Sequence, residues 1–206
     1  MKKYIIISLT VLIAYPCYCQ DKSKESMPPI FKDSAKLNEL KAMAYYPLFN
    51  GGLFSGVLPV DSVDEIPDPK KDYKLLFEFT AGSQDSTGNQ LNPGLVEIAR
   101  IINLHIASGI PISNIHVVIA THGPSLYSIE KNDAYKKKYG VDNPNIKLIQ
   151  QMVQNGVKFI ACGQAMHFFE VEKPDLYWGT KVSLTAQTVL SNYIEQGYVW
   201  YNINGE

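Results

Sequence analysis

Short apolar runs alternate along the chain with longer segments that carry helix-capping signals, and this alternation constrains the fold more than any other feature. Three runs have the length and the branched or aromatic composition of buried strands: 73–79, 115–120 and 157–161. Asn92-Pro93 and Asn143-Pro144 each supply a cap and a first-turn proline for a helix, and Gly109 and Gly156 end these helices. Such alternation predicts βα units and a largely parallel sheet covered on both faces.

The C-terminal part continues the pattern. It predicts a short strand at 180–184, a helix at 185–196 and a last strand at 198–201. Two more helices are expected. One is a short helix at 165–169 within the domain, and the other, at 35–44, precedes the domain. The predicted fold class is therefore α/β, with a mostly parallel sheet of about five strands between two helical layers.

The first twenty residues have the pattern of a secretory signal peptide. Lys2 and Lys3 precede an apolar stretch at 4–15 that is too short to span a bilayer stably, and small and polar residues follow it. Cleavage near Cys19 or Gln20 is expected, which predicts a periplasmic or extracellular protein with no membrane attachment. The alternative is a lipoprotein acylated at Cys17 or Cys19, but neither cysteine follows the usual leucine and small residue.

Residues 21–71 differ in composition from the domain that follows at 72–206. The stretch 21–36 is polar and suits a flexible leader. The stretch 46–69 mixes large apolar residues with turn formers, and it has too little periodicity for a helix. We interpret it as an arm packed on the domain or on a neighbouring subunit.

Composition and motifs argue against several classes of function. The chain has 19 basic and 20 acidic residues, Arg100 is its only arginine, and Lys136-Lys137-Lys138 fits a solvated helix end, so nucleic-acid binding is not expected. No two histidines stand one helical turn apart, which disfavours a metal site. The nucleotide P-loop, the G-x-G-x-x-G fingerprint and the G-x-S-x-G elbow are all missing, and no cofactor is expected.

Cys162 stands where the third predicted strand ends and a glycine-containing turn begins. In α/β proteins this edge of the sheet is where ligands and chemistry collect. Removal of the signal peptide leaves it as the only cysteine, so it has no partner for an internal disulfide. Three interpretations stay open: a small buried apolar residue, a thiol linked to another chain, and a reactive thiol.

Three polar loops leave the same predicted edge, at 81–89, 121–124 and 162–164. If the second and third strands are neighbours, His122 and Cys162 face one pocket, and we predict them as the catalytic pair. Helix amides after Cys162 would favour its thiolate form. On its own, His122 is also explained by a hydrogen bond within its turn, and His167 is a weaker partner. The predicted pocket residues are Gly82, Ser83, Gln84, Gly123, Gly163 and Gln164.

These motifs, taken in order, resemble those of DsrE-like proteins, and the resemblance covers roughly residues 46–203. The segments that carry it are Tyr73 to Phe79, Asn92-Pro93-Gly94-Leu95, His122-Gly123-Pro124, Asn143-Pro144-Asn145, Cys162-Gly163-Gln164, and Ala186 with Gln196-Gly197-Tyr198. One departure is Ala165, which stands where the family often has a serine beside the cysteine motif.

The resemblance implies a three-layer α/β/α domain of flavodoxin-like type that assembles as a trimer or hexamer. It also implies that Cys162 carries sulfur as a persulfide, received from a donor protein and passed to an acceptor, with His122 as a neighbour in the pocket. If the chain is an enzyme, its activity would resemble that of a sulfurtransferase. The alternative is a non-catalytic oligomeric binding module in which Cys162 only lines a pocket. A third hypothesis is redox coupling through an intermolecular disulfide.

Overall fold

The computed structural model describes residues 33–83 and 86–204. The predicted signal peptide, with Cys17 and Cys19, lies outside the described residues, as do most of the leader and the predicted pocket residue Gln84. The chain divides into two units, Met1–Asn38 and Glu39–Glu206. Helix α1, Ser34–Met43, begins in the first unit and has no buried residue.

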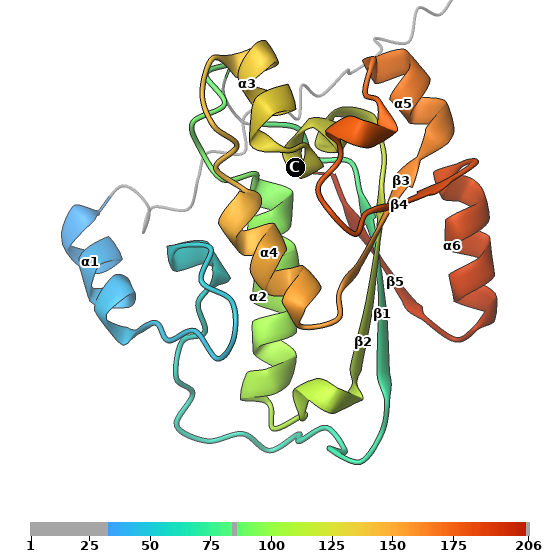
Figure 1. Ribbon diagram of the computed structural model, residues 1–206. Helices are drawn as coiled ribbons and strands as arrows, with labels where there is room; N and C mark the ends of the chain where they lie inside the picture. Colours follow the sequence, from blue (N-terminus) through green and yellow to red (C-terminus); the bar gives the residue numbers. More distant parts are fainter. Residues whose placement is uncertain (1–32, 84–85, 205–206) are drawn as a thin grey trace, which may run out of the picture. The chain divides into compact units, whose positions relative to one another are not determined.

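A five-stranded, fully parallel sheet forms the centre of the second unit (Figure 1). The strand order is β4-β3-β2-β1-β5, so consecutive βα units build outwards from β1 in one direction, and the last strand returns to the other side of β1. The strands are β1 Tyr73–Phe79, β2 Ile115–Thr121, β3 Lys158–Cys162, β4 Lys181–Ser183 and β5 Val199–Ile203.

Helices cover both faces of the sheet. Figure 1 shows α2 and α4 on one face and α6 on the other, with α3 and α5 near the carboxyl ends of the strands. The α-helices are α2 Pro93–Ala107, α3 Asn132–Tyr139, α4 Ile146–Gln154, α5 Gly163–Phe169 and α6 Ala186–Glu195. Short 3-10 helices lie at η2 Leu53–Ser55, η3 Ile112–Asn114, η4 Gly123–Ile129 and η5 Lys173–Asp175. Among the described residues, no helix has both the length and the apolar character needed to cross a membrane.

Alternation along the strands divides the apolar core in two. Odd-numbered residues of β1, such as Phe77 and Phe79, join the larger cluster beneath α2 and α4. Even-numbered positions face α6, where a smaller cluster contains Leu76, Val118, Ala120, Ile160, Val189 and Leu190. Burial on both faces explains why the central strands read as nearly continuous apolar runs in the sequence.

Two close contacts show how tightly the larger layer packs. Gly94, in the first turn of α2, has no room for a side chain, because a Cβ there would lie 2.6 Å from Cε2 of Phe79 and 2.8 Å from Cβ of Ala81. Asn92 caps the same helix through a 2.8 Å bond from the Gly94 N–H to its Oδ1. The helix therefore starts in van der Waals contact with the carboxyl end of β1.

Residues 48–57 pack against α2 around one buried side chain, Asn103. Its Oδ1 accepts hydrogen bonds from the backbone N–H groups of Leu48 and Phe49, and its Nδ2 donates to the carbonyl oxygens of Phe49 and Ser55. Phe49 itself is fully buried in the larger apolar cluster. This part of the predicted arm thus shares the core of the domain in which Asn103 lies.

The fold class predicted from the sequence is confirmed: the domain is an α/β fold with a five-stranded parallel sheet. Several element boundaries differ from the expectation by one to three residues, and two of these differences bear on the site. The helix expected from Asn143-Pro144 begins at Ile146, because Asn143 instead donates to the carbonyl oxygens of Ser128 and Glu130 and accepts from Asn145. Cys162 is the last residue of β3 and not the first residue after it.

Candidate functional site

Cys162 closes β3 and caps the short helix α5 at once. Its Sγ atom accepts a hydrogen bond from the backbone N–H of Ala165, at 3.4 Å, in the position where a serine or asparagine oxygen usually caps a helix. The residue is 5 % exposed, and it is the free cysteine of the described part of the chain. The capping bond therefore holds Sγ at the carboxyl end of the sheet, against the first turn of α5.

His122 occupies the matching position on the neighbouring strand. The ladder between β2 and β3 ends at the pair Thr121 and Ala161, so His122 and Cys162 are the next residues on their two strands. His122 keeps an extended backbone, and its N–H bonds the Phe79 carbonyl oxygen at 3.0 Å. Because side chains alternate along a strand, both residues lie on the face that α6 covers, two positions beyond Ala120 and Ile160. Neighbouring parallel strands lie about 4.8 Å apart.

Gly123 follows His122 and turns the chain sharply away from the sheet. Its φ of 66° lies in the left-handed region, which glycine adopts without steric strain. The hydroxyl of Ser125 then bonds the carbonyl oxygens of Phe79 and His122. These bonds fix the backbone on both sides of the histidine, so its ring stays at the end of β2.

Two residues that the sequence analysis did not single out extend the site across the sheet. Glu78 of β1 places Oε1 3.0 Å from Nε2 of His122, and its Oε2 accepts a 3.1 Å hydrogen bond from Nε1 of Trp200 on β5. The side chains of His122 and Glu78 are 23 % and 13 % exposed. We call Trp200, Glu78, His122 and Cys162 the polar row, because they occupy four adjacent strands on one face.

The other predicted pocket residues lie at the same edge, with differing roles. Gly82 lies beside the turn after His122, since a Cβ on it would come 3.2 Å from Cβ of Pro124. Ser83 has a buried Oγ with no hydrogen-bond partner in the described structure. Gly163 allows close approach of β4, because a Cβ there would lie 2.9 Å from the carbonyl oxygen of Ser183. Gln164 is exposed and donates its backbone N–H to the carbonyl oxygen of Leu184.

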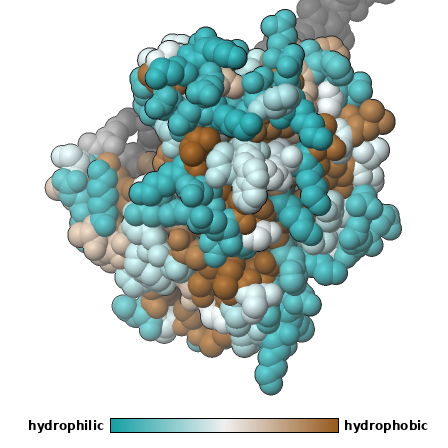
Figure 2. Space-filling view, in the orientation of Figure 1, coloured by the Kyte–Doolittle hydropathy of each residue, from teal (hydrophilic) through white to brown (hydrophobic). Residues whose placement is uncertain are grey.

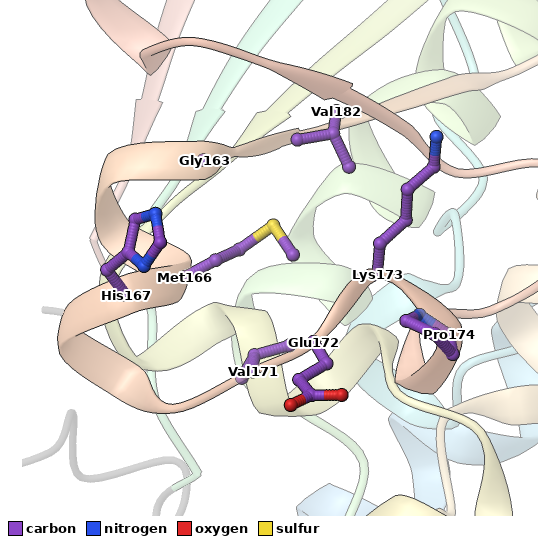
Figure 3. A pocket seen from close by; sticks show the side chains of 8 residues that line it. All are labelled: Gly163, Met166, His167, Val171, Glu172, Lys173, Pro174 and Val182. Carbon is purple, nitrogen blue, oxygen red and sulfur yellow. The ribbon is translucent and has the colours of Figure 1, made fainter.

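A surface cavity of about 460 Å³ opens beside α5 (Figure 3). Of the predicted pocket residues only Gly163 lines it, and neither Cys162 nor His122 does. Its wall combines apolar side chains with charged ones on η5 and the preceding turn. The lining residues are Gly163, Met166, His167, Val171, Glu172, Lys173, Pro174 and Val182.

Glu130 is a buried acid that belongs to no motif visible in the sequence. It is 5 % exposed, and its Oε2 atom has no hydrogen-bond partner in the described part of the chain. Burial, and to a smaller extent the nearby negative charge of Asp175, raises the pKa of its carboxyl to about 7, although Lys138 and Lys137 act in the opposite direction. This group therefore changes its charge near neutral pH.

Surface properties add two observations. The face shown in Figure 2 is mostly hydrophilic, with apolar side chains gathered in its middle and lower parts. Over the described surface, the most exposed large apolar side chains include Phe168, Trp178 and Leu184, which are 84 %, 75 % and 74 % exposed.

The described residues contain no group of three or more histidine, cysteine or acidic side chains able to hold a metal ion.

Comparison with known proteins identifies the family. The family model described as "DsrE/DsrF-like family" matches residues 73–200, which include all four residues of the polar row. One solved structure matched by this chain is a protein of unknown function, MTH1491, from Methanobacterium thermoautotrophicum, with 14% identity and a TM-score of 0.45 over 64% of this chain and 99% of that one. No curated protein matches. The matched residues make up more than half of the chain, and the chain therefore belongs to the DsrE/DsrF-like family.

Proposed function

We propose that this protein binds and transfers sulfane sulfur through the thiol of Cys162. The observation that carries the proposal is the position of Sγ: it lies at the carboxyl end of β3, accepts the Ala165 N–H, and has His122 at the neighbouring position of β2. A thiol that is hydrogen-bonded and beside a proton acceptor has the requirements of an activated nucleophile. Membership of the DsrE/DsrF-like family supports the same chemistry.

The transfer needs no external oxidant or reductant. The Cys162 thiolate attacks the terminal sulfur of a donor persulfide, a new S–S bond forms, and the donor leaves as a thiolate that takes up one proton. Cys162 then carries the persulfide. An acceptor thiolate attacks the outer sulfur in the second step, and Cys162 returns to its starting form.

Intact-mass measurement after incubation with a small-molecule persulfide tests the proposal. In the Cys17→Ser/Cys19→Ser background, the chain that keeps Cys162 is expected to gain the mass of one sulfur atom, and the further substitution Cys162→Ser is expected to abolish this gain. The double variant Cys17→Ser/Cys19→Ser is the matched control, because it leaves Cys162 as the only thiol. A gain of sulfur that persists after Cys162→Ser in this background, or no gain in the control, would contradict a carrier role for this residue.

A second function is favoured by one observation, the 5 % exposure of Cys162. In that alternative the protein is a non-catalytic oligomeric binding module, and the thiol only lines a pocket. A small alkylating reagent separates the two functions. A carrier thiol reacts in the folded protein, whereas a packing thiol reacts only after denaturation.

We further propose that the protein is exported and works as a homo-oligomer. The signal-peptide pattern of residues 1–20 supports export, and the exposed Phe168, Trp178 and Leu184 supply apolar surface of the kind that subunits cover. Cell fractionation tests the first point, and light scattering of the purified chain tests the second. A cytoplasmic location or a monomer at micromolar concentration would contradict the respective point.

A further inference from the structure

The carboxylate of Glu78 is held by donors on both sides. Its Oε1 faces Nε2 of His122 at 3.0 Å, and its Oε2 accepts the indole N–H of Trp200 at 3.1 Å. The three residues lie on three adjacent strands, β2, β1 and β5. An ionised carboxylate only accepts hydrogen bonds, so the histidine tautomer that makes this bond is the one with its proton on Nε2.

The hydrogen bond between Glu78 and His122 determines which ring nitrogen of His122 remains available to exchange a proton. When one nitrogen of an imidazole donates to a carboxylate, the neutral ring keeps its lone pair on the other nitrogen. With Nε2 directed towards β1, Nδ1 is the nitrogen that remains to exchange a proton. Cys162 lies on the opposite side of His122 from Glu78, because β2 separates β1 from β3.

The same strand carries a second histidine–carboxylate pair for comparison. Nε2 of His116, near the start of β2, lies 3.1 Å from Oδ1 of Asp72. These side chains are 44 % and 63 % exposed, at the end of the sheet remote from Cys162. The pair at the carboxyl end is far better shielded, so its geometry is held more strongly and its charges are less screened by water.

We propose that Glu78 is a positioning residue for the Cys162 thiol and acts through His122. The proposal rests on the function proposed above and deepens it. Glu78 holds His122 with Nδ1 as its basic nitrogen and stabilises the imidazolium that forms when this nitrogen accepts the thiol proton. Trp200 restrains the second carboxylate oxygen.

The proton balance of the transfer is then complete within the polar row. The proton of the Cys162 S–H group passes to Nδ1 of His122 as the thiolate attacks the donor persulfide. The imidazolium opposite Glu78 returns this proton to the leaving donor thiolate. No electron leaves the pair of reactants, and no further group is required.

The rate of Cys162 alkylation by iodoacetamide, followed by mass across a range of pH, tests the proposal in the full chain. Glu78→Gln is expected to slow alkylation about tenfold near neutral pH, in proportion to the loss of an oriented general base. The difference should shrink at alkaline pH, where thiols ionise without assistance. Asp72→Asn, the matched control at the other end of β2, is expected to leave the profile unchanged.

A double-mutant cycle shows whether Glu78 acts through His122. In the His122→Gln background, Glu78→Gln should have no further effect on the alkylation rate. Equal slowing in both backgrounds, equal slowing by Asp72→Asn, or no slowing at all would overturn the proposal. If Glu78→Gln does not fold, Trp200→Phe replaces it, since Trp200 is half exposed; slowing is then expected only when His122 is present.

The two proposals fail in different ways. If the wild-type chain gains no sulfur from a persulfide but the Glu78 effect on alkylation depends on His122, the carrier function is wrong and the positioning role stands. If sulfur is gained and the cycle shows no coupling, the carrier function stands and the positioning role is wrong.

Discussion

Replacement of Glu130 by glutamine should remove a large part of the pH dependence of folding. The folded-state pKa of this carboxyl is about 7, against an ordinary value of 4.5, mainly because the group is buried. An acid with a raised pKa stabilises the fold in its protonated form. The stability that it contributes is therefore fully present below about pH 4.5 and is lost as the pH rises through about 7.

The size of the effect follows from the shift. Each unit of pKa difference corresponds to about 1.4 kcal/mol, so a shift from 4.5 to about 7 sets an upper value of about 3.5 kcal/mol. The pKa of about 7 already includes the opposing effect of the lysines of α3. Access of solvent to the carboxyl and the limited pH interval reduce the effect further, and we expect about 1 to 3 kcal/mol between pH 5 and pH 8. Glutamine keeps the shape of the protonated acid and carries no charge at either pH.

Urea unfolding at several pH values measures this difference. The free energy of unfolding of the wild-type chain should fall, relative to that of Glu130→Gln, as the pH rises from about 5 to about 8. Glu195→Gln, at the exposed end of α6, is the control and should run parallel to the wild type. Parallel profiles for the wild type and Glu130→Gln would refute the reasoning, because they would mean that Glu130 titrates alike in the folded and unfolded chain.

Three further substitutions test the packing of the fold. Asn103→Ala should lower the free energy of unfolding by about 2 to 4 kcal/mol, since two buried carbonyl oxygens lose their donor, and limited proteolysis should then cut within 46–57. Gly94→Ala should lower the melting temperature through about 2 to 4 kcal/mol of overpacking, because the new Cβ meets Phe79; an unchanged melting temperature would contradict this contact. Gly163→Ala should push β4 away and increase amide hydrogen exchange at Gln164, and unchanged exchange would show that the strand can adjust.

Local patterns were sufficient to predict most of the fold. The apolar run at 73–79 became β1 with the same bounds, and Asn92-Pro93 began α2 as a cap and a first-turn proline. Asn143-Pro144 carries the same pattern but begins no helix, because its asparagine side chain bonds carbonyl oxygens in a different segment. The difference depends on tertiary contacts, which the local sequence does not contain.

In the candidate site, too, the residues suggested by local sequence patterns were predicted and those brought together by tertiary contacts were missed. His122 and Cys162 were selected because consecutive βα units commonly form neighbouring strands, and the register of β2 and β3 does place them side by side. Trp200 and Glu78 were missed because they meet only through the return of β5 to β1, across 122 positions of sequence. Strand order is set by the packing of whole layers, so no local signal marked this pair.

If Cys162 carries sulfur as proposed, its capping bond links the state of the thiol to the first turn of α5. An atom that gains a covalent substituent loses part of its capacity to accept a hydrogen bond, so a modified Sγ would hold the Ala165 N–H less well. The first turn of α5 would then report the chemical state of the sulfur. Met166 and His167, on that helix, form part of the wall of the cavity in Figure 3. A donor or acceptor bound in this cavity would therefore contact a different surface when Cys162 is a free thiol than when it carries a persulfide.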